Sequence, residues 1–183
     1  MPTAGVDDLR RARRILLYGV TGSGKTTAAD LIASALGLPS HHVDDEIGWL
    51  PSWTERPDDD QRRLATEMVG GERWVIDSAY GKWRDLVVAR TDVIVALDYP
   101  RWLSLARLAR RTLKRLVFRE QICNGNQESI RKLFSSDGII AWHFQSFQRK
   151  HATILAMESA TGGPPVVRLQ HPRDLNRLLA ALP

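Results

Sequence analysis

Eight consecutive residues near the beginning of the chain combine three glycines, one lysine and two threonines. They read Gly-Val-Thr-Gly-Ser-Gly-Lys-Thr over residues 19–26, directly after the apolar run Ile15–Tyr18 and before an amphipathic run. The glycines allow a tight turn in which successive backbone N–H groups point inward, and the start of a helix adds the positive end of its dipole. This spacing between a strand and a helix predicts a loop that cradles phosphate groups.

The same spacing gives each polar side chain of the loop a task. We expect Lys25 to reach the β- and γ-phosphates of ATP as a catalytic cation, and the Thr26 hydroxyl to ligate Mg²⁺. A glycine-rich turn without a ligand is the plain alternative, which the strand-loop-helix context disfavours. The predicted nucleotide-binding residues are Gly19, Thr21, Gly22, Ser23, Gly24, Lys25, Thr26 and Thr27.

Two common classes of phosphate-loop protein are disfavoured by other segments. A regulatory GTPase needs an N-K-x-D segment to read guanine, and the sequence contains none. A motor or transporter ATPase ends its second motif with Asp and then a catalytic Glu, whereas Ser78 follows Asp77 here. The remaining expectation is an ATP-dependent kinase that transfers the γ-phosphoryl group to a small acceptor.

Asp77 ends an apolar run that begins at Arg73. A carboxylate at the end of a strand beside the loop suits an Mg²⁺ site, so Asp77 joins Thr26 as a predicted metal residue. An ordinary helix cap at the end of the strand is the alternative.

Three arginines recur at intervals of four residues in the segment Arg101–Arg119, which contains basic residues and no acidic one. Arg107, Arg111 and Arg115 share one face of a predicted helix. A transferring phosphoryl group spreads charge over its oxygens, so we predict that Arg107 and Arg111 are catalytic. The alternative is a solvated stripe opposite an apolar face, which would contain Leu105, Leu108, Leu113 and Leu116.

The elements that would position these groups alternate along the chain. Apolar runs separated by helical patterns predict a doubly wound α/β domain with five parallel strands and helices on both faces. The predicted strands are 14–19, 41–44, 73–77, 92–98 and 165–169. The predicted helices are 25–36, about 58–69, about 82–90, 101–117, 128–160 with a break near Gly138, and 173–182.

Composition sets the wider limits. A chain of 183 residues suits a single domain, and one cysteine, Cys123, rules out an intrachain disulfide, which favours a cytoplasmic location. No apolar run approaches the length of a membrane span. The net charge of +5 suggests an anionic partner. Nucleotides satisfy this, but so does nucleic acid, so a nucleotide-dependent regulator whose basic segment contacts a polymer stays open as the second function class. The oligomeric state is not predicted.

The chain resembles the adenylate-kinase-like P-loop proteins often labelled topology modulation proteins. The segments that carry the resemblance are "GVTGSGKTTAADLIASALGLP", "HHVDDEIGWLPSWTERP", "RWVIDSAYGKWRDLVVARTDVIVALDYPRWLSLARLARRTLKR" and "NGNQESIR". It implies a nucleoside-monophosphate-kinase fold, ATP and Mg²⁺, and a mobile basic lid at about 107–130. It also implies that His171-Pro172-Arg173 shapes the adenine pocket, with Arg173 binding the nucleotide.

The acceptor side departs from true adenylate kinases, which carry a Ser/Thr-Gly-Asp turn after the second strand. Here that place holds "VDDEIGW", so Asp44 and Asp45 would face the acceptor. A carboxylate suits a hydroxyl acceptor, which must be oriented and lose a proton. We predict that Asp44 is the base, with Asp45 nearer Mg²⁺ or capping the next turn, although their roles can be exchanged.

Three nearby residues complete the expected acceptor pocket. Trp49 and Trp53 would line it beside the carboxylates, or pack in the core or at its rim. Arg84, after the third strand, would hold an anionic group of the acceptor, or lie on a helix surface. We count Trp49 and Arg84 among the predicted substrate-binding residues.

Overall fold

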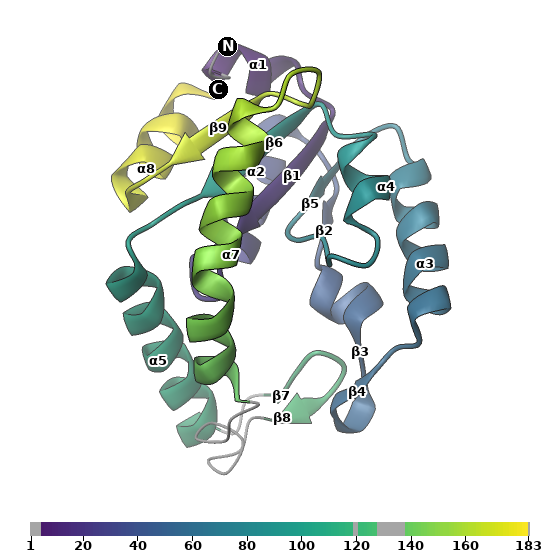
Figure 1. The fold of residues 1–183 in the computed structure, drawn as a ribbon, viewed down its shortest axis with the longest axis vertical. Coiled ribbons are helices and arrows are strands. Elements are labelled where there is room, and N and C mark those ends of the chain that lie inside the picture. The colour runs from purple at the N-terminus through teal and green to yellow at the C-terminus, as the bar shows by residue number, and fades with distance from the viewer. Residues whose placement is uncertain (1–4, 119–120, 128–137, 183) are drawn as a thin grey trace.

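The computed structural model describes residues 5–118, 121–127 and 138–182 (Figure 1). Its centre is a sheet of five parallel strands, as the sequence predicts, in the spatial order β2-β5-β1-β6-β9. The strands are β1 (Arg14–Gly19), β2 (Ser40–His41), β5 (Trp74–Ile76), β6 (Val93–Leu97) and β9 (Val166–Leu169).

Helices cover both faces of the sheet because side chains along the buried strands alternate in direction. In β1, Ile15 and Leu17 face one core, and Leu16 and Tyr18 face the other. The first core is closed by α1 (Val6–Arg11), α2 (Lys25–Leu36) and α8 (Pro172–Ala181). The second is closed by α3 (Asp58–Gly70), α4 (Arg84–Val88) and α7 (Ile139–Ser159).

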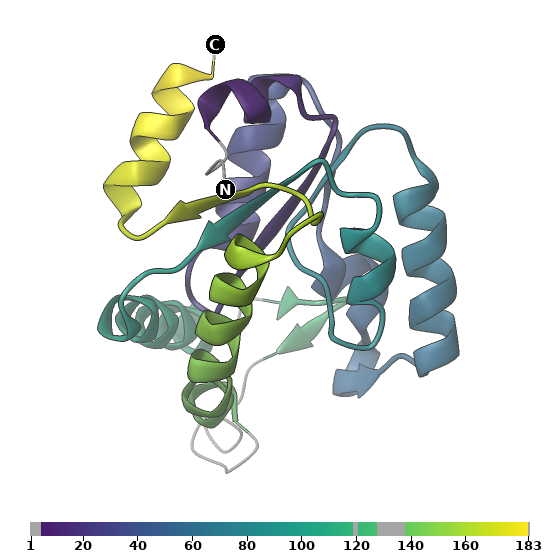
Figure 2. The same ribbon diagram turned by 45° about the horizontal axis from the view of Figure 1, so that its top comes forward.

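A further helix, α5 (Arg101–Phe118), runs beside α7 below the sheet in the views of Figures 1 and 2. Its buried residues are Ser104, Leu108 and Thr112. Leu113, which the sequence placed on an apolar face, has 62% of its surface exposed. The prediction that Leu113 lies on the apolar face is therefore wrong, because the helix packs through the face that contains Leu108.

The parallel register brings the carboxyl ends of the strands to one edge of the sheet. Gly19 at the end of β1 pairs with Leu97 at the end of β6, and Leu16 pairs with Ile76 at the end of β5. At the opposite edge, an Arg14–Asp92 ion pair of 2.6 Å joins the start of β1 to the start of β6. The loop after β1 therefore opens beside the residues that follow β2 and β5.

The predicted strand 41–44 is wrong beyond His41. The chain leaves the sheet because the next backbone N–H groups are bound by carboxylates: that of His42 by Glu46 at 2.7 Å, and that of Val43 by Asp77 at 3.0 Å. A single wide helical turn, η1 (Asp44–Gly48), follows. Asp44 and Asp45 thus lie on a turn instead of a strand.

Several elements differ from the predictions or were not predicted. Two hairpins appear, β3 (Trp49–Leu50) with β4 (Thr54–Glu55), joined through η2 (Pro51–Trp53), and β7 (Gln121–Ile122) with β8 (Asn126–Gln127). The helix expected at 82–90 is shorter in the structure, where it is α4 (Arg84–Val88). Of the helix expected at 128–160, residues 128–137 lie outside the described residues. In the described part of the chain, no helix is both long and apolar enough to cross a membrane.

Candidate active site

The loop of residues 19–26 is held in a tight conformation by α5. Gly22 has a φ of 84°, and a Cβ there would collide with the backbone oxygen of Ser104 and the side chain of Leu108. Only glycine combines this backbone conformation with so close an approach. The first turns of α5 thus pack directly on the loop whose shape they fix.

The helix that follows the loop begins without a cap. Gly24 precedes α2 with a left-handed backbone, no side chain caps this end, and its first turn contains no acidic residue. By contrast, the first turn of α8 is capped by His171 and Asp174. The first N–H groups of a helix need partners, and this N-terminus is suited to an anion.

Lys25 points back into the loop, where its ammonium group donates to the carbonyl oxygen of Val20 at 3.1 Å. Burial, with the nearby charge of Lys150, lowers the pKa of Lys25 to about 8. The carboxylates of Asp77 and Asp44 act in the opposite direction, and Arg111 adds to the lowering. Phosphate oxygens around this buried lysine would stabilise its charged form, because they supply the opposite charge.

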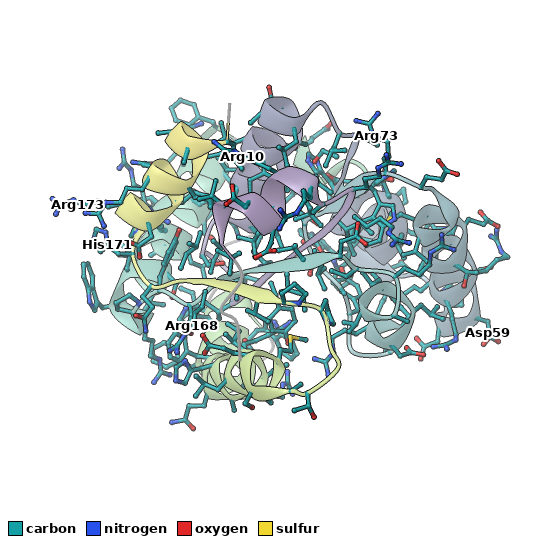
Figure 3. The ribbon with its side chains drawn as sticks, turned by 90° about the horizontal axis from the view of Figure 1, so that it is seen from above. Arg10, Asp59, Arg73, Arg168, His171 and Arg173 are labelled. Atoms are coloured by element: carbon teal, nitrogen blue, oxygen red, sulfur yellow. The ribbon has the colours of Figure 1, made fainter. Side chains whose placement is uncertain are left out.

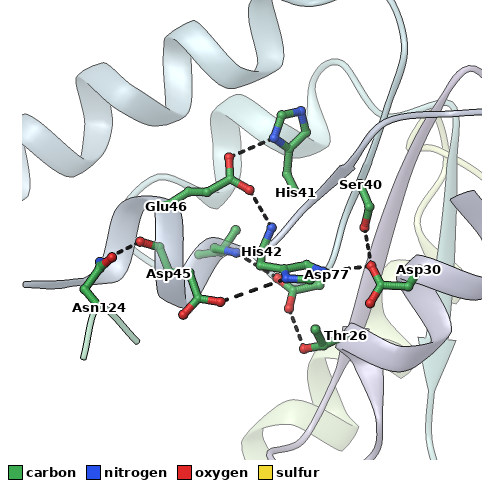
Figure 4. A network of polar contacts seen from close by, with 10 residues as sticks. Thr26, Asp30, Ser40, His41, His42, Asp45, Glu46, Asp77 and Asn124 are labelled. Carbon is green, nitrogen blue, oxygen red and sulfur yellow. Dashed lines mark hydrogen bonds and ion pairs between the residues drawn. The ribbon is translucent and has the colours of Figure 1, made fainter. Parts of the chain in front are cut away.

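Thr26, the residue after Lys25, meets Asp77 of the segment that follows β5, and Figure 4 shows their contact. The Thr26 hydroxyl donates to Asp77 at 2.6 Å, and the other carboxylate oxygen accepts from the Val43 N–H. Asp77 is 5% exposed, and burial raises its pKa although both hydrogen bonds oppose that change. In the described part of the chain no group of three or more His, Cys, Asp or Glu side chains could hold a metal ion. A hydroxyl backed by one carboxylate fits Mg²⁺, which keeps waters and takes phosphate ligands.

The histidines before η1 pair with carboxylates (Figure 4). His41 contacts Glu46 at 2.9 Å, and His42 contacts Asp30 of α2 at 2.8 Å. Ser40 also donates to Asp30, at 2.8 Å. These contacts anchor the start of η1 to α2, the helix that carries the loop residues.

Asp44 is oriented by a tyrosine from the segment after β5. The Tyr80 hydroxyl donates to Asp44 at 2.5 Å, and burial and the Asp44 charge raise the pKa of Tyr80, which keeps it a donor. A Cβ on Gly48 would collide with the Tyr80 ring, so that glycine makes room for the contact. Asp44 is otherwise exposed, whereas the Asp45 carboxylate lies 3.9 Å from His42. The two carboxylates therefore have different surroundings.

The β7–β8 hairpin, which follows α5 in the chain, docks on the segment that carries Asp44. The Asn124 amide donates to the carbonyl oxygens of Asp45 and Trp49 at 2.8 and 2.7 Å. Asn126 accepts from the Trp53 N–H at 2.6 Å. The two tryptophan rings pack edge to face, 5.6 Å apart. Sequence reasoning missed this hairpin, although the dipeptide Asn124-Gly125 is a strong turn signal.

The arginines of α5 face the loop and the hairpin. Arg107 donates to the Ser23 carbonyl at 3.1 Å, and its guanidinium lies 5.4 Å from the centre of the Tyr99 ring. Burial and the Asp44 and Asp45 charges raise the pKa of Cys123 in the hairpin to about 12, against the charges of Arg115 and Arg111. Together with the effect of Arg111 on Lys25, this places the predicted stripe beside the site.

The last two predicted residues lie in different places. Arg84 donates to the Tyr18 hydroxyl at 3.1 Å, beside the end of β1. Lys150 of α7 lies over the same ring, 4.4 Å from its centre, and no sequence motif pointed to it. Arg173 is exposed and points away from the sheet in Figure 3, so it does not join the cluster around the loop.

No protein-family model matches the chain. Among curated proteins, the chain is similar to the uncharacterized protein YqaC of Bacillus subtilis (strain 168), with 28% identity over 106 residues. The match covers 56% of this chain and spans only 58% of that relative.

Solved structures match over nearly the whole chain. A gluconokinase from Sinorhizobium meliloti 1021 has a TM-score of 0.52 at 16% identity, over 92% of this chain and 90% of its own. Shikimate kinase from Aquifex aeolicus vf5 has a TM-score of 0.53 at 15% identity, over 91% of both chains. A sugar kinase from Janibacter sp. HTCC2649 has a TM-score of 0.53 at 20% identity, over 93% of this chain and 94% of its own. At these identities the likeness shows the fold, and the chain has the α/β fold of the P-loop kinases.

Proposed function

We propose that this protein is an ATP-dependent phosphotransferase that phosphorylates a hydroxyl group of a small acceptor. One observation carries the proposal: the Asp44 carboxylate, held by Tyr80, lies close enough to the loop lysine to act on the pKa of Lys25. A group that accepts a proton thus stands opposite a loop built for phosphate. The names of the matched kinases, for gluconate, shikimate and sugars, agree with a small acceptor.

On the nucleotide side, the backbone N–H groups of the loop and of the first turn of α2 would bind the β- and γ-phosphates of ATP. Lys25 would neutralise their charge, with Arg107 and Arg111 stabilising the charge that spreads over the transferring group. Thr26 and Asp77 would hold Mg²⁺, which supplies further neutralisation of phosphate charge when bound. Arg173 would have to reach the adenine from its exposed position, so we keep it only as a peripheral contact.

On the acceptor side, the hydroxyl oxygen would attack the γ-phosphorus as the bond to the β,γ-bridging oxygen breaks. Asp44 takes the hydroxyl proton, and ADP leaves with the bridging oxygen. Tyr80 fixes the orientation of Asp44, and Trp49 lines the acceptor pocket. Asp45, turned toward His42, supports the turn instead of taking the proton.

Three finer assignments belong to the same proposal. We include the assignment of the chain to the topology modulation proteins, which the order of its motifs supports. The region 107–130 acts as a lid that closes over both substrates. The hydrogen bond from Asn124 to the Asp45 carbonyl oxygen is a contact between this region and the acceptor segment. The protein works in the cytoplasm as a single P-loop kinase-like domain of residues 1–183.

ADP release with a set of acceptors tests this function. We expect nucleosides and small hydroxyl compounds to be phosphorylated faster than AMP or CMP. Asp44→Asn should lower kcat by about 10²-fold or more while ATP still binds, because base or orienting help is lost. Asp45→Asn is the matched control and should have a much smaller effect. ADP formation with AMP that is insensitive to Asp44→Asn would overturn the hydroxyl acceptor. Salt-sensitive DNA retention without ADP release would favour the regulator instead.

A further inference from the structure

Two cations from different helices share one aromatic ring at the end of β1. The Lys150 ammonium group of α7 lies 4.4 Å from the centre of the Tyr18 ring. The Arg84 guanidinium, at the start of α4, lies 5.9 Å from the same centre and donates to the Tyr18 hydroxyl at 3.1 Å. Tyr18 is only 2% exposed and directly precedes Gly19. The ring therefore gathers two positive charges beside the phosphate loop.

Neither of these cations has a carboxylate partner among residues 5–118, 121–127 and 138–182. Two other half-buried cations are paired with carboxylates: Arg14 with Asp92 at 2.6 Å, and Arg168 with Asp98 at 2.7 Å. Partly buried charges are normally paired because an uncompensated charge is costly to remove from water. Arg84 and Lys150 differ from these two arginines, because among the described residues their positive charges have no carboxylate beside them, and an anion from outside the chain would compensate both.

The charge environment of Lys150 points the same way. Burial, with the neighbouring charges of Arg84 and Arg149, lowers the pKa of Lys150 to about 8. Two like charges held side by side destabilise each other, and a bound anion would relieve both. Perturbed groups that converge in this way are typical of a functional site.

Arg84 and Lys150 lie near groups of the acceptor side, although the Lys150 charge also acts on Lys25 of the loop. Arg84 directly follows Trp83, whose ring lies 5.6 Å from that of Tyr80, the residue that orients Asp44. The Asp44 charge also acts on Lys150, where it opposes the lowering of the pKa. A small molecule whose hydroxyl contacts Asp44 would therefore place its other groups near these two cations.

We propose that the acceptor carries an anionic group, a carboxylate or a phosphate, besides the hydroxyl that is phosphorylated, and that Arg84 and Lys150 bind this group. The inference rests on the phosphotransferase function proposed above. It narrows the acceptors from hydroxyl compounds in general to hydroxy acids and phosphorylated polyols. A planar guanidinium beside a compact ammonium suits the oxygens of either anion through charge-assisted hydrogen bonds.

Matched pairs of probes test this inference. D-gluconate is compared with neutral D-glucitol, and D-glucose 6-phosphate with D-glucose, by ADP release and by the shift in melting temperature. In at least one pair, we expect kcat/KM to be about tenfold or more higher for the anionic member. Arg84→Gln and Lys150→Met should each raise the KM for the anionic member about tenfold, and change the KM for the neutral member by less than about twofold. Lys150→Arg should restore much of the loss, and Arg90→Gln, an exposed site just after α4, should have no effect.

The two readouts separate this inference from the function on which it rests. ADP release that favours the neutral member of both pairs overturns the anion subsite and leaves the phosphotransferase intact. Equal losses with neutral and anionic acceptors in Lys150→Met also overturn it, because they place Lys150 on the transferred phosphoryl group. Melting shifts by anionic probes that depend on Arg84 and Lys150 without ADP release support the subsite and overturn the phosphotransferase. If no probe shifts the melting temperature and no probe is turned over, the anion subsite is overturned.

Discussion

The two halves of the candidate site are built in opposite ways. The phosphate-binding half comes from one contiguous stretch, residues 19–26, backed by Asp77. The acceptor half is assembled from four separate segments, represented by Asp44, Tyr80, Asn124 and Lys150. The contiguous loop carries its phosphate-binding groups in one stretch of backbone against which α5 packs, whereas the acceptor half exists only when all four segments are folded together.

This difference implies a division of labour. Substitutions in the contiguous half should affect phosphoryl transfer to every acceptor, because each reaction uses the same phosphates. Substitutions in the assembled half should discriminate among acceptors.

Lys25→Ala should lower turnover by about 10²-fold or more with every acceptor, because it removes a buried charge that would neutralise the transferring group. ADP release measures the loss, and circular dichroism checks that the fold is intact. Lys82→Ala, at an exposed lysine paired with Asp58, is the control. Undiminished turnover in Lys25→Ala would remove the kinase interpretation altogether.

Arg107→Ala and Arg111→Ala should each lower kcat by about tenfold or more while changing the melting temperature little, since exposed arginines contribute little to folding. Arg110→Ala, an exposed site on the same helix, is the matched control. If Arg107→Ala and Arg111→Ala both turn over as fast as the unmodified protein and Arg110→Ala, the arginine stripe is a solvated face and the catalytic cation lies elsewhere.

Tyr80→Phe should lower kcat by about tenfold for hydroxyl acceptors without changing the KM for ATP, because it removes only the donor that orients Asp44. Tyr99→Phe is the control, since the buried Tyr99 hydroxyl has no hydrogen-bond partner among the described residues. A rise in the KM for ATP in Tyr80→Phe would contradict the division between the two halves.

ATP binding should weaken by about fourfold between pH 7 and 8.5, the smallest effect. The free protein loses the Lys25 proton as the pH rises through about 8, whereas bound phosphate favours the charged form. The charged lysine is therefore fully present only below that pH. Titration calorimetry measures the change, and Lys25→Arg, which stays charged, should flatten most of it. A constant affinity in the unmodified protein would show that Lys25 does not contact the phosphates.

The contrast between the halves also explains what the sequence could predict. The phosphate loop and the Thr26–Asp77 neighbourhood could be expected because spacing and strand ends determine them locally. The shortness of β2 could not, because it depends on Glu46 and Asp77 carboxylates that take the backbone N–H groups after His41.

Tyr80 and Lys150 show a second limit. Neither belongs to a motif, and each reaches the site only through tertiary packing: Tyr80 by its fit against Gly48, and Lys150 by the position of α7 over Tyr18. The hairpin at Asn124 is different, because its Asn-Gly signal was readable, although the surface on which it docks was not.

The edge-to-face pair of Trp49 and Trp53 has a spectroscopic consequence. Two indole rings 5.6 Å apart at an interplanar angle of 79° couple their electronic transitions. Asn124 binds the carbonyl of Trp49 and Asn126 binds the N–H of Trp53, so the geometry of the pair follows the position of the hairpin. We therefore expect the circular dichroism couplet of these indoles to change sign or amplitude whenever the hairpin lifts. The two tryptophans would therefore serve as an intrinsic spectroscopic probe of the hairpin position, without an attached dye.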